Sequence, residues 1–517
     1  MWHFLTFFLL QYLLGHSSGS RILGVFPHVA RSHFMMSETL MKGLAARGHE
    51  VVVISHFPQK TQIPNYTDIS LVGSMPNFVS TVPLDVIATD SVYTIVTLLA
   101  ELAVTGCEKT LSHPPVLKLI NSKETFDLVI TELFNTDCYV GFAYKFQAPF
   151  ISIVTTPLLP WGYERFANPD NPSYIGNIFL GHSDKMSFLE RLVNTIYLKK
   201  SQWEYHYWFD LPSQAVARRY FGESLPPLAE FVRNTSLVLV NRHFSLNQPV
   251  PNVPSVIEVG GLHVQIPKKL PEDIDKFLNE SEHGAIFFSL GSTVRADTFS
   301  QQKMAAFLQA FSELPQRILW KWEGSTLPGQ PKNIKTAKWL PQVDVLGHPK
   351  VRLFLTHGGL MGTMEAVFSG VPMVAIPLFG DQFHNVKNLQ DEGIAVKLDH
   401  MSVTKEKVLA ALREVLSNPS YKENAMAVSR AFRDRPMSPL NTAMFWTEYV
   451  IRHRGAPHMR SAALELSWYQ YLLLDVIAVL FVITAASLLT LYVIFKKLFH
   501  LLVSKPLHSK AEKKKMN

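Results

Sequence analysis

The sequence predicts an α/β protein built from two doubly wound domains that face a cleft, followed by one C-terminal transmembrane helix. Three observations support this. Short apolar segments alternate with helical patterns in both halves of the chain, a proline-rich stretch separates the halves, and an unbroken apolar run lies near the end. With 517 residues the chain is too long for one compact domain. In folds of this class ligands bind at the carboxyl ends of the parallel strands.

The first half begins with a strand–helix–strand pattern. Between its first two strands, Met36, Leu40 and Leu44 recur at helical spacing up to Gly48, which is suited to end a helix. The segments that predict strands in this half are Arg21–Phe26, Val51–Ser55, Phe126–Thr131 and Phe150–Val154. We assign residues 20–247 to a first domain.

A linker and a second α/β series follow. Pro249, Pro251, Pro254 and Pro267 lie close together, with Gly260 and Gly261 between them, so we assign residues 248–283 to the linker and residues 284–455 to the second domain. The segments that predict its strands are Ala285–Ser289, Ile318–Trp322, Val351–Thr356 and Val374–Ile376, and Lys405–Leu416 has a helical pattern.

The two ends predict a single-pass type I membrane protein. Residues 1–19 contain an apolar core followed by small residues and resemble a cleaved secretory signal, with an uncleaved anchor as the alternative. Residues 456–475 form a juxtamembrane segment, and Val476–Phe495 is apolar over a length that spans a bilayer core. Residues 496–517 form a basic cytosolic tail. Lys514 and Lys515 resemble an endoplasmic-reticulum retrieval signal, which would place the catalytic domains in the lumen of that membrane.

The charge distribution argues against several classes of protein. Most of the formal net charge of +7 comes from the lysines of the tail, so the body lacks the basic surface that nucleic acids require. No G-x-G-x-x-G motif indicates a dinucleotide site, and no His/Cys cluster has metal-ligand spacing. Cys107 and Cys138 are the only cysteines, and whether they pair stays open. Candidate glycosylation sites are Asn65, Asn234 and Asn279.

The most informative stretch is Phe354–Gln382. It contains a strand, a His-Gly-Gly turn, a helix that carries Glu365, a second strand and a loop that ends in Asp381 and Gln382. A helix N-terminus beside His357 suits a diphosphate, because free N–H groups and a partial positive charge point at the anion. A carboxylate two turns along that helix can accept hydrogen bonds from ribose hydroxyls.

This stretch resembles the signature of the UDP-glycosyltransferases, and the chain resembles the membrane-bound, insect-like animal glucosyl and glucuronosyl branch of that family. The resemblance implies the GT-B architecture of two Rossmann-like domains, a UDP-sugar as co-substrate and no metal or other cofactor. The donor-binding residues that it implies are Ser292, Trp339, Gln342, His357, Gly359, Gly362, Thr363, Glu365, Asp381 and Gln382. One position departs from the pattern: many vertebrate members have an Asn where this chain has Met361, and Thr363 with the Gly362 N–H can substitute for it.

The general base is expected from the first half. His33, at the start of the first helix, matches the family's catalytic His, and an imidazole is the commonest general base. A carboxylate should orient it. Glu132 lies at a strand end where many members have Asp, and Asp137 lies five residues further with the Asp identity, so both stay candidates. His28 is a weaker rival that we interpret as structural.

The predicted function is transfer of a hexose, with glucose favoured over glucuronic acid, from a UDP-sugar to a hydroxyl of a small lipophilic or phenolic acceptor. The family implies inversion at the anomeric carbon. The alternative is a non-catalytic UDP-sugar-binding regulatory or scaffold protein of the same membrane. Aromatic residues between Phe57 and Tyr220 fit a lipophilic acceptor, and a homo-oligomer is compatible with the sequence.

Overall fold

The computed structural model describes residues 19–76, 79–84, 92–327 and 329–504. The predicted signal peptide and the two lysines of the predicted retrieval signal lie outside the described residues, apart from Gly19. Residues up to Arg460 form one compact unit and those from Ser461 onward form another.

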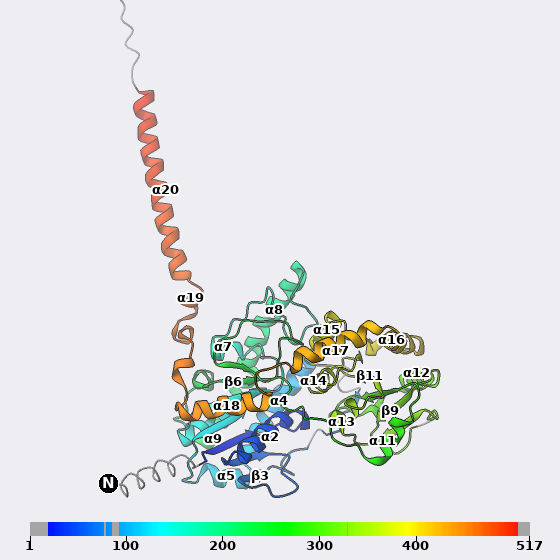
Figure 1. Cartoon of the computed structure of the whole chain (residues 1–517). Coiled ribbons are helices and arrows are strands. Elements are labelled where there is room, and N and C mark those ends of the chain that lie inside the picture. The colour runs from blue at the N-terminus through cyan, green and yellow to red at the C-terminus, as the bar shows by residue number, and fades with distance from the viewer. Residues whose placement is uncertain (1–18, 77–78, 85–91, 328, 505–517) are drawn as a thin grey trace, which may run out of the picture. The chain divides into compact units, whose positions relative to one another are not determined.

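The first half of the large unit is built on a seven-stranded parallel sheet in the order β3-β2-β1-β4-β5-β6-β7 (Figure 1). Its inner strands are buried on both faces, which explains their continuous apolar sequences. The strands are β1 (Arg21–Phe26), β2 (Glu50–Ser55), β3 (Tyr66–Ser70), β4 (Leu128–Glu132), β5 (Phe150–Val154), β6 (Val238–Val240) and β7 (Val256–Glu258). The longer helices of this half are α2 (Arg31–Ala46), α4 (Val92–Leu111), α8 (Phe188–Glu204) and α9 (Leu211–Phe221).

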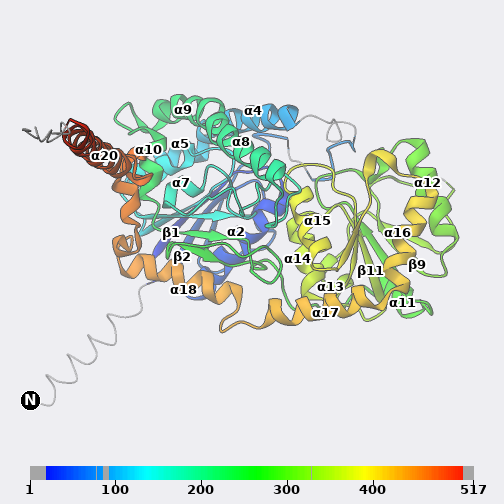
Figure 2. The same cartoon turned by 90° about the horizontal axis from the view of Figure 1, so that it is seen from above.

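The second half has a six-stranded parallel sheet in the order β10-β9-β8-β11-β12-β13, again with helices on both faces (Figure 2). The strands are β8 (Ala285–Ser289), β9 (Arg317–Lys321), β10 (Ile334–Ala337), β11 (Val351–Thr356), β12 (Met373–Ala375) and β13 (Ala395–Lys397). Its helices include α12 (Gln301–Ser312), α13 (Gln342–Leu346), α14 (Leu360–Phe368), α15 (Gln382–Asp391), α16 (Lys405–Ser417) and α17 (Pro419–Arg433). The two doubly wound domains confirm the predicted fold class.

The chain crosses between the halves more often than the sequence indicates. Strand β7 and helix α11 (Glu272–Asn279) form within the predicted linker, and β7 completes the first sheet. Helix α18 (Pro439–Arg452), which we assigned by position to the second domain, packs on α2 of the first half. Its buried face includes Ala443, Met444 and Val450, and a proline at its first turn lets it start anew after α17.

A short segment of the first half also reaches the second. The Ser80 N–H donates to the Ser292 carbonyl at 2.8 Å, Val82 bridges Val294, and Leu84 is buried in the core of the second half. This segment therefore joins the halves at the loop that follows β8.

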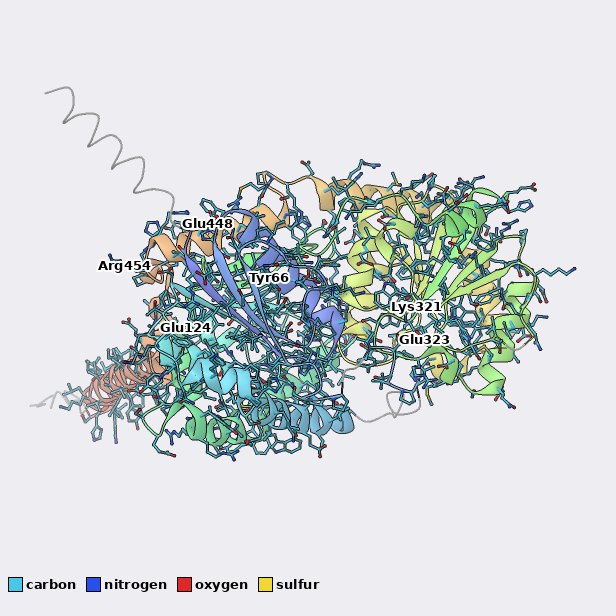
Figure 3. The ribbon with its side chains drawn as sticks, turned by 90° about the horizontal axis from the view of Figure 1, so that it is seen from below. Tyr66, Glu124, Lys321, Glu323, Glu448 and Arg454 are labelled. Carbon is cyan, nitrogen blue, oxygen red and sulfur yellow. A yellow bond between two sulfur atoms is a disulfide. The ribbon has the colours of Figure 1, made fainter. Side chains whose placement is uncertain are left out.

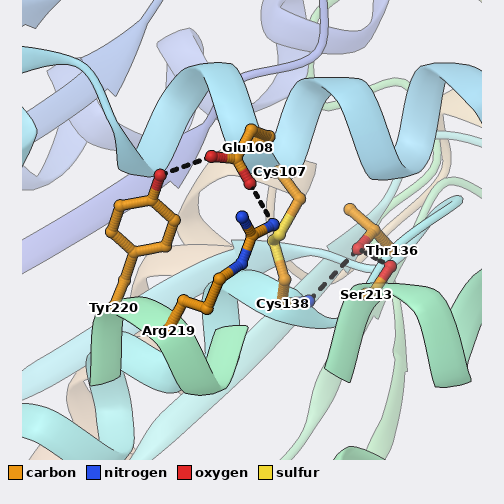
Figure 4. Close-up of a disulfide and its surroundings, with 7 residues drawn as sticks. All are labelled: Cys107, Glu108, Thr136, Cys138, Ser213, Arg219 and Tyr220. Carbon is orange, nitrogen blue, oxygen red and sulfur yellow. Dashed lines mark hydrogen bonds and ion pairs between the residues drawn. A yellow bond between two sulfur atoms is a disulfide. The ribbon is translucent and has the colours of Figure 1, made fainter. Parts of the chain in front are cut away.

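Cys107 and Cys138 form a disulfide, which settles a point that the sequence left open (Figure 4). The bond ties α4 to the loop that follows β4. Around it, the Glu108 carboxylate accepts hydrogen bonds from Arg219 and from the Tyr220 hydroxyl at 2.6 Å, so α4 is also fixed to α9. The loop after β4, which carries Asp137, is held rigidly as a result.

Helix α20 (Leu474–Val503) is the one helix among the described residues that is long and apolar enough to cross a membrane. It has 30 residues and a mean hydropathy of 2.6 over its most apolar window. The short helix α19 (Trp468–Tyr471) precedes it and carries exposed aromatic side chains. The helix extends beyond both ends of the span predicted at 476–495.

Candidate active site

The first-half part of the site is His33, in the first turn of α2. Its Nδ1 lies 2.5 Å from Glu132 Oε1 at the end of β4 and 3.2 Å from Thr155 Oγ1, and Thr155 Oγ1 lies 3.3 Å from the same carboxylate oxygen. An ionised carboxylate can only accept, so Nδ1 carries a proton and Nε2 is left as the basic nitrogen. Because β1 and β4 are neighbours, the fold brings the start of α2 beside the end of β4.

The two carboxylates that the sequence left open have different surroundings. Asp137 does not contact His33: its carboxylate accepts hydrogen bonds from Arg165 and from the Tyr205 hydroxyl at 2.7 Å, and all three side chains are buried. Asp137 is the partner of a buried cation, and the structure brings only Glu132 to His33. Four residues lie between the two carboxylates, enough to turn Asp137 toward η2 (Tyr205–Asp210).

His28 packs against His33 and against the start of α2. Its ring stacks on His33 with centroids 4.0 Å apart, and its Nδ1 accepts the Ala30 N–H at 3.1 Å, just before α2 begins. Burial lowers the pKa of His28 well below its usual range, and the nearby His33 adds to this. A neutral, buried imidazole that accepts a backbone hydrogen bond fits the structural role that the sequence suggested.

A cavity opens beside this group. Its walls include His28, Glu132, Phe134, Met75, Leu102 and Tyr139. The edge of the Phe134 ring lies against His33 with centroids 4.5 Å apart. The lining is mixed, since polar Asn135 and Thr136 also face the cavity, and its volume is about 30 Å³.

The second-half part of the site is centred on His357, which follows β11. Burial lowers the pKa of His357 to about 4, with a further contribution from Lys321, so the imidazole is neutral near pH 7. Its Nδ1 has no hydrogen-bond partner among the described residues. A Cβ at Gly291 would lie 2.7 Å from the ring and one at Gly359 2.5 Å from it. Both glycines are therefore required for the ring to sit between the β8 loop and the start of α14.

Glu365 lies on α14 and is almost wholly buried. It accepts a hydrogen bond from Gln342 Nε2 at 2.6 Å, and His263 Nε2 lies 3.7 Å from its other oxygen. Burial raises the pKa of Glu365 to about 7, while the hydrogen bond from Gln342 opposes the rise. Gln342, which the resemblance placed among the donor-binding residues, thus uses its NH2 group for Glu365 in this structure.

Asp381 and Gln382 lie at the start of α15, where the second half meets the first. Burial raises the pKa of Asp381 above its usual value, and His33 is close enough for its charge to oppose that rise. Gln382 Oε1 accepts the backbone N–H groups of Leu378 and Phe379, which leaves its NH2 group as the part that can serve a ligand. The structure thus brings the candidate base His33 close to the predicted donor-binding carboxylate Asp381, although 348 positions separate them in the sequence.

The remaining predicted donor residues lie on several segments of the second half. Trp339 is 59% exposed. The Thr363 hydroxyl, in the first turn of α14, is buried without a partner among the described residues, and Gly362 packs beside Gln342. Ser292 lies in the loop that is bound to the Ser80 segment.

Lys321 is a candidate that the sequence reasoning missed. It ends β9, lies 5.9 Å from the Trp339 ring centroid, and is close enough to His357 to lower its pKa. Its Nζ forms an ion pair with Glu323, which lies beside it (Figure 3). It also donates to Ser80 Oγ at 3.2 Å. The sequence could have indicated Lys321, because it lies near the carboxyl end of the predicted strand Ile318–Trp322 and ligands bind at such strand ends in this fold.

The three candidate glycosylation sites, Asn65, Asn234 and Asn279, are exposed. Their use stays a prediction. Within the described residues no three His, Cys, Asp or Glu side chains are grouped as a metal site would require.

Comparison with known proteins agrees with this geometry. The family model described as "UDP-glucoronosyl and UDP-glucosyl transferase" matches residues 22–511. The chain belongs to this family. It is a UDP-glycosyltransferase, an enzyme of the class that transfers glucose or glucuronic acid. Its relatives in the family match almost the whole chain.

Two relatives illustrate this. UDP-glucosyltransferase 2 of Dactylopius coccus is 44% identical over 512 residues, covering 98% of both chains. UDP-glucuronosyltransferase 1A3 of Rattus norvegicus is 34% identical over 500 residues, covering 94% of this chain and 92% of the relative. The crystal structure of a UDP-glucose:anthocyanidin 3-O-glucosyltransferase in complex with UDP has a TM-score of 0.58 at 19% identity, covering 84% of this chain and all of that one. This last similarity shows that the UDP-glycosyltransferase has the GT-B fold.

Proposed function

We propose that this UDP-glycosyltransferase transfers glucose, with inversion, from UDP-glucose to the hydroxyl of a small lipophilic acceptor, and that it does so while anchored in the endoplasmic-reticulum membrane with its large unit in the lumen. The observation that carries the proposal is the His33–Glu132 pair, which lies close to Asp381 of the second half.

The chemistry follows from the positions of these side chains. His33 Nε2 takes the proton of the acceptor hydroxyl as its oxygen attacks the anomeric carbon, and Glu132 stabilises the imidazolium that forms. One bond forms from the acceptor oxygen to the anomeric carbon. The bond from that carbon to the phosphate oxygen breaks, and its electron pair leaves with UDP. A single displacement of this kind inverts the configuration.

The leaving diphosphate is stabilised from the second half. The neutral His357 ring, the N-terminus of α14 and the buried Thr363 hydroxyl can donate hydrogen bonds to it, and each such donor is worth ~10²–10³ in rate. Lys321 adds a cation in the same region. These groups support transfer without a metal, so we expect activity to survive EDTA.

Glucose is favoured over glucuronate as the sugar by two facts. The Dactylopius coccus relative at 44% identity is named a glucosyltransferase. Near the donor site, Lys321 is already paired with Glu323, so its charge is compensated before a sugar carboxylate arrives. The lipophilic acceptor is supported by the Phe134 ring against His33 and by apolar Met75 and Leu102 in the small cavity beside Glu132. The anchor is supported by the length and hydropathy of α20.

The test compares wild type with His33→Ala in detergent-solubilised full-length protein. Wild type should convert a phenol with UDP-glucose at least tenfold faster than with UDP-glucuronate, with product mass as the readout. His33→Ala should lose turnover and still bind UDP within twofold, because its contacts lie in the first half. Full turnover in His33→Ala would refute the base assignment. UDP binding without turnover in wild type would favour a non-catalytic binding protein.

A further inference from the structure

Three polar side chains stand in a row at one edge of the first sheet. Glu132 ends β4, Thr155 follows β5 and Asn241 follows β6, and these strands are neighbours in the order β4-β5-β6. The carboxyl ends of parallel strands form the edge where ligands bind in this fold. The chemistry proposed above uses Glu132 and gives no part to Asn241, which is 0% exposed. A buried amide needs hydrogen-bond partners inside the protein, and those of Asn241 indicate its role.

The Asn241 amide joins three segments of the chain. Its Nδ2 donates to the Thr155 carbonyl at 2.9 Å and to the Met361 sulfur at 3.5 Å, and its Oδ1 accepts the Gly261 N–H at 3.2 Å. A carbonyl and a thioether only accept and a backbone N–H only donates, so the orientation of the amide is fixed. The backbone N–H of Asn241 donates to the Val154 carbonyl at 2.9 Å, which holds the residue beside the end of β5.

On the first-half side the amide leads to the base. Thr155, whose carbonyl accepts from Asn241, has its Oγ1 3.3 Å from Glu132 Oε1 and 3.2 Å from His33 Nδ1. Asn241, Thr155 and Glu132 are all buried. Because a packed interior transmits displacements, a shift of the Thr155 backbone would move the carboxylate that orients His33.

On the second-half side the amide reaches α14. Met361 lies in the first turn of this helix, the turn that also carries the buried Thr363 hydroxyl and that we assign to the leaving diphosphate. The Met361 side chain packs on the core of the first half, and its carbonyl accepts from His263 Nε2 at 3.1 Å. Figure 2 shows α14 on the side of the second half that faces the first. The first turn of α14 is therefore held by two residues, Asn241 and His263, that follow β6 and β7.

We propose that Asn241 is a positioning residue of the transfer reaction. By holding the end of β5 and the first turn of α14 together, it sets the distance between the sugar on UDP and the base His33. It acts through Thr155 and Met361 and takes no part in bond making. The inference rests on the proposed function, because it takes His33 as the base and the start of α14 as the diphosphate site. A displacement of about 1 Å between reacting groups can cost ~10² in rate, so loss of this link should lower kcat rather than affinity.

The first experiment shortens this amide and a matched amide elsewhere in the first half. In Asn241→Ser the side chain is too short to reach both the Thr155 carbonyl and the Met361 sulfur. The control is Asn194→Ser on α8. Asn194 is 1% exposed, donates to two backbone carbonyls at 2.8 Å and accepts one backbone N–H at 2.8 Å. Both variants should lose stability, because each leaves buried polar groups unpaired.

Turnover of a phenol with saturating UDP-glucose is measured per UDP-binding site, with full-length protein in detergent. We expect Asn241→Ser to lower kcat at least tenfold, with KM for the phenol and the dissociation constant for UDP within twofold of wild type. Asn194→Ser should keep all three within twofold. A residue that only supports the fold would lower the folded fraction without separating kcat from KM. A smaller loss of kcat in Asn241→Ser, or an equal loss in Asn194→Ser, would overturn the proposal.

The second experiment determines whether Asn241 acts through Thr155. Thr155→Val keeps the backbone carbonyl and the approximate size of the side chain but removes the hydroxyl that contacts Glu132. If this hydroxyl transmits the effect of Asn241, kcat of the double variant should lie within threefold of that of the slower single variant. Losses that multiply would show that the two residues act independently and would contradict the proposal.

Met361→Leu tests the same link from the second half if Asn241→Ser does not fold. Leucine has a similar volume and lacks the sulfur acceptor, so kcat should fall at least threefold while UDP affinity stays the same. An unchanged kcat would refute the link.

His33→Ala in the same assay separates these outcomes from a failure of the proposed function. Full turnover in His33→Ala would refute the base itself. An inactive His33→Ala together with a fully active Asn241→Ser would refute the positioning role and leave the proposed function intact.

Discussion

Glu132→Gln isolates the charge of the carboxylate that orients His33. The substitution keeps the size of the side chain, which is nearly buried, and keeps an oxygen that can accept from Thr155. It removes the negative charge that faces the imidazolium 2.5 Å away. A hydrogen bond to a charged group contributes ~1.5–3 kcal/mol. An amide can also donate to Nδ1 and so favour the wrong tautomer, which costs up to ~10⁴ in related triads.

We therefore expect kcat to fall by ~10²–10⁴, equivalent to ~3–5 kcal/mol of transition-state stabilisation. The assay is single-turnover formation of the glucoside with saturating UDP-glucose, and UDP affinity is measured by titration calorimetry on the same preparation. The dissociation constant for UDP should stay within twofold, because the donor residues lie in the second half.

The matched control is Asp137→Asn, which changes the other candidate carboxylate. It removes the carboxylate that is paired directly with the buried Arg165, which costs ~3–5 kcal/mol of stability. Its melting temperature should fall, while kcat per folded molecule stays within about threefold of wild type. A Glu132→Gln enzyme within threefold of wild type, or an equal loss of kcat in folded Asp137→Asn, would refute our assignment of Glu132.

Three further predictions concern the second half and the disulfide. Burial raises the pKa of Glu365 to about 7 from an unfolded value of 4.5, so the protonated side chain contributes its full stability below pH 4.5. As the pH rises toward 7 the free energy of unfolding falls by up to ~3 kcal/mol. The melting temperature of the apo wild type should therefore fall relative to that of Glu365→Gln between pH 5 and 7. A ribose whose hydroxyls donate to Glu365 favours the ionised carboxylate, so the affinity for UDP should rise between pH 6 and 8 more steeply in wild type than in Glu365→Gln. The mutant corrects for the titration of UDP itself, which is the same for both proteins. Parallel plots of UDP affinity against pH, measured by calorimetry, would disprove this. His357→Gln should lower kcat ~10²–10³ with the pH profile unchanged between pH 6 and 8, since His357 titrates near pH 4; a shift of the profile would count against it. The double variant Cys107→Ala/Cys138→Ala removes a disulfide that joins residues 31 positions apart, which should lower the free energy of unfolding by roughly 3–4 kcal/mol. Thermal unfolding should begin several degrees lower and should no longer respond to dithiothreitol. An unchanged melting curve would contradict the estimate.

Strands buried on both faces were the most predictable elements of the fold. Arg21–Phe26, Phe150–Val154, Ala285–Ser289 and Val351–Thr356 were predicted with the boundaries that the structure has, because a strand covered on both sides must be apolar throughout. Strand β7 was missed, since it has three residues inside a proline-rich stretch and its pairing with β6 is a tertiary contact.

Some site residues could be predicted from the local sequence, and others could not because their roles depend on tertiary contacts. The donor motif is local in sequence, so its composition could be read directly. The choice between Glu132 and Asp137 could not, because it depends on whether Arg165, a residue of the later helix α7 (Tyr163–Phe166), captures one of the two carboxylates. Lys321 was missed for a related reason: its relevance comes from Trp339 and His357, which lie on other segments.

The departure at Met361 shows how far a local motif can be interpreted. Its sulfur lies 3.5 Å from Asn241 Nδ2, which also donates to the Thr155 carbonyl at 2.9 Å, and Thr155 contacts both His33 and Glu132. The side chain therefore faces the first half rather than a ligand beside His357. A residue in a donor signature predicts donor chemistry only if its side chain points at the donor. Here the position links the first turn of α14 to the His33–Glu132 pair, a role that an apolar, flexible methionine can fill.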